Sequence, residues 1–398
     1  MYDIASFEKE LESIFDFWIT FTSDEKNGGF YGKIDHDNKV YPEAPKGSVL
    51  NARILWSFSA AYNLTQNPTY LKLAKQGFAY IDAFFIDKIY SGVYWTVDFQ
   101  GKPLDTKKQI YALSFTIYGL AEYYKACQDG RALELAKQLF IAIEKYSFDP
   151  ERGGYLEAFA QNWDELPDLR LSAKDANEKK TMNTHLHILE AYTNLYRIWP
   201  DELLEKQIRR LIHNFLEYMI DPKTHRLILF LDENWQPKSD TVSYGHDIEA
   251  SWLLLEAAEV LNDEMLLLQV KKECVAMARA AASGLDADGS MYYEYEPQHQ
   301  HLSKDRHWWV QAEAMVGFLN AWQLTGEQHF FDQFESVWKY IQKHIIDKEN
   351  GEWVWGIRDD QTLMPGEDKA GLWKCPYHNS RALIEVIHRL KKASPPTN

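Results

Sequence analysis

The sequence has 398 residues, and 43 basic against 59 acidic side chains give it a formal net charge of −16 at pH 7. This charge, with no cluster of lysine or arginine to offset it, argues against binding to nucleic acids or to anionic membranes. No apolar run approaches the roughly 20 residues that span a bilayer, and the acidic start of the chain does not resemble a signal peptide. We therefore expect a cytoplasmic protein.

The cysteine content indicates the redox compartment of the protein, and the aromatic content indicates the kind of core or pocket to expect. Three cysteines are too few for a disulfide framework, which fits a reducing compartment. Aromatic residues are abundant, with 14 Trp, 23 Tyr and 20 Phe. This surplus predicts either a large core or a pocket with aromatic walls.

A glycine followed by aromatic or β-branched residues recurs along the chain. The copies begin around Gly28, Gly92, Gly153, Gly289 and Gly351. Neighbouring glycines are 61 to 64 residues apart, except for the interval of 136 residues between the third and fourth. That interval contains HRLILFLDENW, from His225, which we interpret as a further copy that has lost its glycine. The sequence therefore predicts six repeat units.

Each unit carries two stretches with apolar residues at helical spacing. The first helices are predicted at 7–22, 69–87, 131–147, 202–220, 264–283 and 327–346. The second helices are predicted at 47–65, 107–127, 180–198, 245–262, 306–325 and 375–392. This pattern indicates an all-α fold, an (α/α)6 barrel with short β-hairpins in the long loops at one end. We expect one catalytic domain over 1–392 and a disordered tail at 393–398.

The connections predict where a site would lie. Links from a second helix to the next first helix are short and contain turn residues, whereas links from a first to a second helix are long and contain the glycine motifs. One end of the barrel should therefore be closed by tight turns and the other surrounded by six large loops. Ligand sites favour a looped mouth, and all six second helices begin there.

The first turns of the second helices are rich in chemically useful side chains. The candidate site residues are Arg53, Tyr111, Asn183, His187, His246, Glu249, Trp252, Trp308, Trp309, Glu313, Trp373 and His378. Five of the 13 histidines fall in these short windows. Several members are three or four residues apart and so share one helix face. A single histidine on such a helix is more often a core residue, but this convergence favours a site.

Much of the aromatic surplus should line the rim and walls of the same pocket. The tryptophans expected there are Trp95, Trp308, Trp309, Trp353, Trp355 and Trp373. Trp308 and Trp309 are adjacent, so we expect only one of them to face inward on the helix.

No cofactor motif accompanies these residues. Cys375 and His378 have a Cys-x-x-His spacing, but further ligands for zinc are missing nearby. HExxH, phosphate-loop and dinucleotide-binding motifs are absent from the sequence. We therefore expect a site without metal or cofactor.

A cavity with aromatic rings, carboxylates, arginine and histidines suits a carbohydrate, because rings stack on sugar C–H faces while polar groups bond the hydroxyls. Two chemistries compete. An inverting glycosidase would need two carboxyl groups among Glu249, Glu313 and Asp247. Proton abstraction beside a carbonyl needs a base near neutral pKa and a cation for the enolate, which the histidines and Arg53 fit better.

The segments KGSVLNARILWSFSAAY, NTHLHILEAY, SYGHDIEASWLL, RHWWVQAEAMVGFLNAW and GLWKCPYHNSRA also resemble the N-acylglucosamine 2-epimerase superfamily, and within it the cellobiose 2-epimerases. The resemblance covers nearly the whole chain. It implies an (α/α)6 barrel that converts glucose-type reducing ends to mannose-type ends without metal or nicotinamide. It also implies that His378 and His246 remove and return the C2 proton through a cis-enediolate, and that Arg53 stabilises the enolate oxygen.

The remaining roles follow from the same resemblance. His187 and Asn183 would contact the reacting sugar and assist ring opening. The carboxylates would orient hydroxyls and histidines, and the aromatic residues would stack on the sugar or shape the pocket; these are Glu249, Glu313, Trp309, Trp373, Trp308 and Tyr111.

The substrate implied is a β-1,4-linked disaccharide, with cellobiose converted to glucosyl-mannose, and loop 153–179 should decide whether a second sugar fits. A mannose or glucose 2-epimerase, an aldose–ketose isomerase, an inverting glycosidase and a non-catalytic sugar-binding toroid stay open as alternatives. We expect a small sugar as the partner, and the sequence leaves the oligomeric state open.

Overall fold

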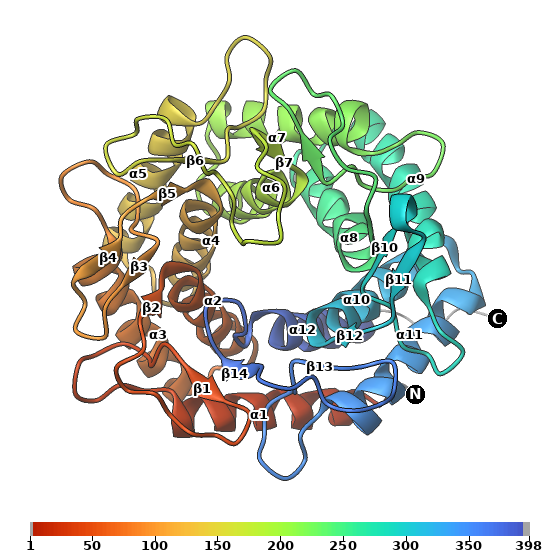
Figure 1. Ribbon diagram of the computed structural model, residues 1–398, viewed down its shortest axis with the longest axis horizontal. Coiled ribbons are helices and arrows are strands. Elements are labelled where there is room, and N and C mark those ends of the chain that lie inside the picture. The colour runs from red at the N-terminus through yellow and green to blue at the C-terminus, as the bar shows by residue number, and fades with distance from the viewer. Residues whose placement is uncertain (1–2, 393–398) are drawn as a thin grey trace.

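The computed structural model describes residues 3–392. Twelve α-helices in this part of the chain form two concentric rings, one inside the other (Figure 1). Each inner helix contacts the next one, and α12 contacts α2, so the inner ring is closed. The predicted (α/α)6 barrel is confirmed. The tail at 393–398 lies outside the described residues, and within 3–392 no helix is both long and apolar enough to cross a bilayer.

The inner ring consists of the predicted second helices. They are α2 (Ser48–Thr65), α4 (Ile110–Cys127), α6 (Met182–Tyr196), α8 (Tyr244–Val260), α10 (Trp308–Thr325) and α12 (Tyr377–Lys392). Most are buried on every side; in α2, each residue from Ser48 to Ala61 is buried. A helix enclosed in this way needs apolar or small residues around its whole circumference.

The outer ring consists of the predicted first helices. They are α1 (Ile4–Phe21), α3 (Pro68–Tyr80), α5 (Gly130–Tyr146), α7 (Glu202–Asn214), α9 (Glu264–Ala281) and α11 (Gln328–Tyr340). Each buries one face against the inner ring, as an amphipathic helix does. Helices α3, α7 and α11 each continue into one π-helical turn, at Ile81–Phe85, Phe215–Met219 and Ile341–Ile345. The first-helix ranges predicted from periodicity include these turns.

Short strands surround the mouth and connect neighbouring units. They are β1 (Ile34–Asp35), β2 (Lys46–Gly47), β3 (Thr96–Val97), β4 (Pro103–Asp105), β5 (Lys108–Gln109), β6 (Ala158–Phe159), β7 (Lys180–Thr181), β8 (Phe230–Leu231), β9 (Val242–Ser243), β10 (Glu294–Glu296), β11 (His301–Ser303), β12 (Arg306–His307), β13 (Gly356–Ile357) and β14 (Asp368–Ala370). The strand before each inner helix pairs antiparallel with a strand of the following unit, as β2 does with β3 and β5 with β6. β14 pairs with β1 and closes this ring too.

This pairing corrects several predicted helix starts. The sequence predicts that inner helices begin at residues 107, 180 and 306, but α4, α6 and α10 begin two or three residues later. The residues in between belong to β5, β7 and β12, whose backbone groups bond to the next unit. Strands of two residues are too short to show a periodic pattern in sequence.

The repeat turns confirm the six units. Gly28, Gly153 and Gly351 have φ of 81°, 74° and 77°, in the left-handed region that favours glycine. His225 has φ of 55° in the copy without glycine. The backbone therefore makes the same turn there, although a side chain is present.

An ion pair with a buried basic side chain accompanies the turn in five of the six units within residues 3–392. The pairs are Asp24–Lys46, Asp87–Lys108, Asp149–Lys180, Asp286–Arg306 and Asp347–Lys369. The acid precedes the glycine turn and the base lies before an inner helix. Each pair therefore holds the mouth loop against the barrel.

Lys108→Met should destabilise the protein strongly. Both side chains of the Lys108–Asp87 pair are fully buried, with Nζ 2.6 Å from Oδ2, and removing one member of such a pair costs about 3–5 kcal/mol. Lys391→Met is the control, because its pair with Glu8 is exposed and should contribute less than about 1 kcal/mol. Urea unfolding monitored by circular dichroism would measure both. Equal loss in the two variants would contradict the assigned role of the buried pair.

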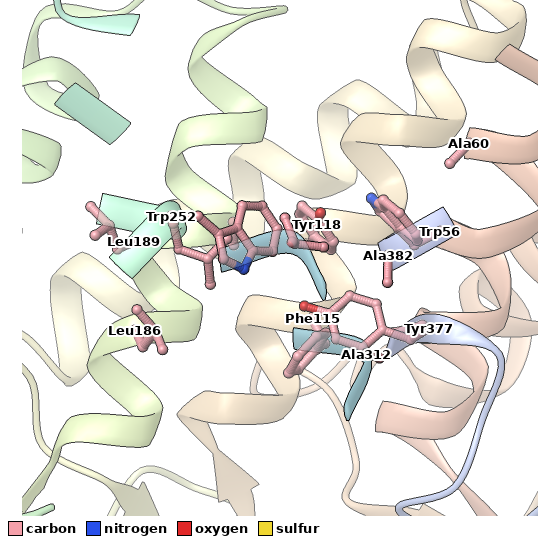
Figure 2. Close-up of a cluster of buried hydrophobic side chains, with 14 of the residues drawn as sticks. Trp56, Ala60, Phe115, Tyr118, Leu186, Leu189, Trp252, Ala312, Tyr377 and Ala382 are labelled. Atoms are coloured by element: carbon pink, nitrogen blue, oxygen red, sulfur yellow. The ribbon is translucent and has the colours of Figure 1, made fainter. Parts of the chain in front are cut away.

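Aromatic side chains fill the barrel axis below the mouth (Figure 2). The ring of Trp56 stacks on Tyr118 at 5.2 Å, and Tyr377 lies edge-on to Phe115 at 5.2 Å. Trp252 is also within this cluster and only 1% exposed. The cluster closes the barrel from below, so that a ligand enters only from the looped end.

Candidate active site

A cavity of about 980 Å³ opens at the looped mouth. First-turn residues of the inner helices line it, as the sequence predicts. Ten of the twelve candidate residues are in its wall: Arg53, Tyr111, Asn183, His187, His246, Glu249, Trp308, Trp309, Trp373 and His378. A volume of this size holds a small-molecule ligand.

Two histidines are held by carboxylates behind them. His378 Nδ1 is 2.7 Å from Glu313 Oε1, and His187 Nδ1 is 2.8 Å from Glu190 Oε2. A carboxylate accepts the Nδ1 proton in each pair, and in a neutral imidazole this bond leaves Nε2 with a free lone pair. Burial and the neighbouring Arg53 and Arg381 guanidinium groups hold the pKa of His378 well below its usual range. His378 is therefore neutral at pH 7 and able to take up a proton.

His246 approaches the cavity from another helix. Its Nδ1 is 2.8 Å from the Ser243 hydroxyl, and burial lowers its pKa to about 3. The indole of Trp309 contacts both imidazoles, with ring centroids 4.8 Å from His246 and 5.7 Å from His378. The two histidines therefore reach the same part of the cavity from different helices, α8 and α12.

Arg53 supplies a permanent positive charge in the cavity wall. Its Nη2 donates to the Tyr111 hydroxyl at 2.7 Å, and its guanidinium lies over the rings of Phe115 and Tyr377 at 4.1 and 4.8 Å. Burial alone would lower the pKa of Arg53, but Tyr111, Cys375 and other electron-rich neighbours raise it. The charge is held rigidly and close to His378, where an oxyanion would be stabilised.

Arg381 links the groups behind the cavity. Its Nη2 donates to Glu249 and to Glu313, at 2.6 Å in both cases, and its Nη1 donates to Glu190. All four side chains are buried, with exposures of 5% or less. The Tyr377 hydroxyl donates to Glu190 at 2.6 Å. One guanidinium thus orients the carboxylates that in turn hold His187 and His378.

Sequence reasoning missed Arg381, Glu190 and Tyr377. A signal for the first two was present, because Glu190 follows His187 by three residues and Arg381 follows His378 by three. That spacing places each pair on one helix face.

The carboxylates Glu249 and Glu313 with His378 form the one cluster in residues 3–392 whose spacing would suit a metal ion, with ligand atoms within 4.8 Å of one another. Arg381 bonds both carboxylates, so the cluster already contains a cation. Burial and the nearby Glu313 raise the pKa of Glu249 to about 7. This set of side chains is therefore better suited to binding the Arg381 guanidinium than to binding a metal ion.

Two candidate residues lie below the cavity wall. Glu313 is fully buried and bonds His378 and Arg381, while the Trp252 indole donates to Glu313 at 3.1 Å. Both therefore reach a bound ligand only through other side chains. His185, from the same first-turn windows, bonds the carbonyl of Thr181 and the amide of Tyr155 instead.

The tryptophans divide between rim and core. Trp355, Trp308 and Trp309 all line the cavity, so both adjacent indoles reach it, contrary to our expectation that one would turn away. Trp308 is 2% exposed, and Trp309 is the more open of the two. Trp95 packs against Trp373 at 5.8 Å.

Trp353 does not belong to the rim. It is fully buried, and its indole donates to Glu10 of α1 at 2.8 Å. Residues two apart in a regular strand share a side, but Trp353 forms an isolated bridge with Ile346 and a bend at Trp355 follows it, so the two indoles separate.

The comparisons with known proteins decide the family. The N-acylglucosamine 2-epimerase (GlcNAc 2-epimerase) family matches residues 29–382, which is most of the chain. The protein belongs to this family. This epimerase is 49% identical to the cellobiose 2-epimerase of Bacteroides fragilis over 381 residues, which cover 96% of this chain and 97% of the relative. It is therefore a carbohydrate epimerase, an isomerase.

Solved structures agree with the assignment. Cellobiose 2-epimerase from Bacillus thermoamylovorans B4167 matches the epimerase with a TM-score of 0.93 at 41% identity, over 97% of this chain and 99% of that one. A D-mannose isomerase matches with a TM-score of 0.84 at 20% identity, over 98% of both chains. The likeness to the D-mannose isomerase shows only that the two proteins share a fold.

The three carboxylates proposed from the sequence for an inverting glycosidase do not have the geometry of one. Such enzymes hold two carboxyl groups roughly 6.5–9.5 Å apart across the scissile bond, whereas Glu249 and Glu313 contact the same arginine nitrogen. Asp247 points away, toward Arg226 and the amide of Leu227. None of the three carboxylates considered from the sequence faces another across the cavity.

Proposed function

We propose that the protein epimerises C2 of the reducing-end sugar of a β-1,4-linked disaccharide, converting cellobiose to glucosyl-mannose without a cofactor. The observation that carries the proposal is that His378 and His246, whose pKa values burial lowers, line one cavity together with the Arg53 guanidinium. The identity of 49% to a protein named cellobiose 2-epimerase supports the choice of substrate.

The reaction begins with the sugar in its open-chain form. Nε2 of His378 takes the proton from C2, the C2–H electron pair forms the C1–C2 double bond, and negative charge moves to the carbonyl oxygen. Arg53 stabilises that oxygen, because a fixed cation in a buried site interacts strongly with developing charge. Glu313 holds the imidazole in place and favours the imidazolium that forms.

The return of the proton completes the inversion. The negative charge of the cis-enediolate raises the proton affinity of His246, because an opposite charge favours the charged form of a base. His246, having taken a proton from solvent through the open mouth, delivers it to the opposite face of C2. The positions of the two histidines on different helices, both in contact with Trp309, support this division of roles.

Other wall residues bind the sugar. His187 and Asn183 project from the same face of α6, one turn apart, and contact the reacting ring during opening. Trp373 and Trp309 are partly exposed and stack on sugar faces. Trp308 and Tyr111 shape the wall, and Glu249, which lines the cavity, orients a hydroxyl.

Product analysis distinguishes this function from its competitors. An aldose–ketose isomerase shares the first step but returns the proton to C1. After incubation with cellobiose, chromatography and NMR should show glucosyl-mannose as the first product. A glucosyl-ketose as the main product would favour the isomerase, release of glucose would favour a glycosidase, and turnover of mannose or glucose alone would favour a monosaccharide enzyme.

A further inference from the structure

One wall position differs in chemistry between the six units. In each unit an antiparallel bridge joins the end of the outer helix to the residue after the turn, as Phe148 is joined to Tyr155. Two residues beyond the bridge, the six units carry Gly32, Trp95, Glu157, Leu229, Tyr293 and Trp355. The third unit alone in this set has an ionisable carboxyl.

Backbone bonds show that these positions are equivalent. The carbonyl groups of Trp95, Glu157, Leu229 and Trp355 each accept the amide of the first residue of an inner helix in the preceding unit. Glu157, Leu229, Tyr293 and Trp355 also line the cavity. The repeat therefore places one residue per unit in a ring around the mouth, and Glu157 is the carboxyl in that ring.

Glu157 is buried without a counter-ion. It is 1% exposed, and its two carboxylate oxygens accept hydroxyl bonds from Thr181 and Thr184, at 2.7 Å each. In residues 3–392, no lysine, arginine or histidine forms an ion pair with it, unlike the acids of the repeat turns. Burial raises the pKa of Glu157 to about 7. An uncompensated carboxyl of this kind costs stability, and such groups in a cavity wall are candidates for function.

A polar atom without a hydrogen-bond partner among the described residues lies in the same cavity wall. Thr181 caps α6 and Thr184 is in its first turn, and Asn183 of that turn lines the cavity together with Glu157. The Oδ1 atom of Asn183 is buried and makes no hydrogen bond with the described residues. Two acceptors in one cavity wall require a ligand rich in donors, which a neutral sugar supplies with its hydroxyls.

We infer that Glu157 is a specificity-determining residue that accepts a hydrogen bond from a hydroxyl of the bound sugar, away from C2. The inference rests on the proposed function for the identity of the sugar. Glu157 belongs to the ring of loop residues at the mouth, whereas His246 and His378 belong to the first turns of inner helices. It therefore contributes to binding and leaves the chemical step to the histidines.

Steady-state kinetics with cellobiose test this role. Glu157→Leu removes the acceptor and should raise KM about tenfold or more, with kcat within about threefold of the unaltered enzyme. Glu157→Gln keeps an acceptor and should raise KM by no more than about threefold. Glu157→Gln should also melt at or above the original temperature, since it removes a buried charge that nothing compensates.

Glu144 provides the matched control. This partly buried carboxyl on α5 also accepts hydroxyl bonds, from Tyr155 and Tyr192, but it does not line the cavity. Glu144→Gln should leave KM and kcat unchanged. The inference would be overturned by an unchanged KM in Glu157→Leu, by a fall in kcat alone, or by the same rise in KM in the control.

A failure of the proposed function can be distinguished from a failure of the inference about Glu157. If the unaltered protein binds cellobiose in calorimetry but does not convert it, the assigned reaction is wrong, and weaker binding by Glu157→Leu still supports the inference. Equal binding by both proteins would overturn it independently of turnover. If the Leu variant does not fold, Glu157→Ala, which also removes the acceptor, takes its place in the same calorimetry.

Discussion

Replacing His378 with alanine should lower kcat about 10³-fold, within the range of 10²–10⁴ that general acid–base catalysis contributes. The variant loses the Nε2 lone pair that faces the cavity, while its partner Glu313 keeps the bond to Arg381. The fold should persist, because α12 stays packed in the inner ring. Turnover of cellobiose followed by NMR, with circular dichroism as a check on folding, measures the effect.

His213→Ala is the control for this prediction. His213 is on the outer helix α7, is exposed, and bonds only the backbone of its own helix through Nδ1. Its replacement should change kcat less than twofold. A kcat near the original value for folded His378→Ala would remove His378 from the mechanism.

Replacing Arg381 with leucine should cause the largest loss of stability. The change would leave Glu190, Glu249 and Glu313 buried without their shared cation, and breaking a buried ion pair costs about 3–5 kcal/mol. Arg381→Lys keeps one charge but cannot reach all three carboxylates at once. We expect it to fold with reduced stability and a lower kcat, since His187 and His378 lose their fixed orientation.

Arg389→Leu on the same helix is the comparison for Arg381. Its one carboxylate partner, Glu385, is partly exposed, and its other contacts, Asn320 and Gln323, are neutral, so the loss should be smaller than for Arg381→Leu. Urea denaturation of the three variants gives the stabilities. A stability of Arg381→Leu equal to that of Arg389→Leu would show that the buried network is not held by Arg381.

The residues that line the cavity could be predicted from sequence, because helical periodicity and the repeat place them without knowledge of distances. Asn183 and His187 are four apart on α6, and this spacing alone put them on one face. The repeat then identified the end of the barrel at which six such faces meet. The main (α/α)6 architecture followed from the same two regularities.

Two features could not be predicted in the same way: how far each side chain lies below the mouth, and which residues of different helices and strands contact one another. Trp252 shares a face with His246 and Glu249 but lies within the axial aromatic cluster, since each helical turn moves a residue further from the mouth. The strands between units contain only two or three residues, too few for an alternating pattern. Partners such as Arg381 and Glu190 come from different helices, and their meeting depends on how the ring closes.

The most direct measurement of the central claim is deuterium incorporation during turnover of cellobiose in D2O. If His378 removes the C2 proton and His246 returns one taken from solvent, the glucosyl-mannose formed must carry deuterium at C2, visible as loss of the H2 signal in NMR. Product that retains its original hydrogen at C2 throughout would contradict a two-histidine exchange of the proton with solvent.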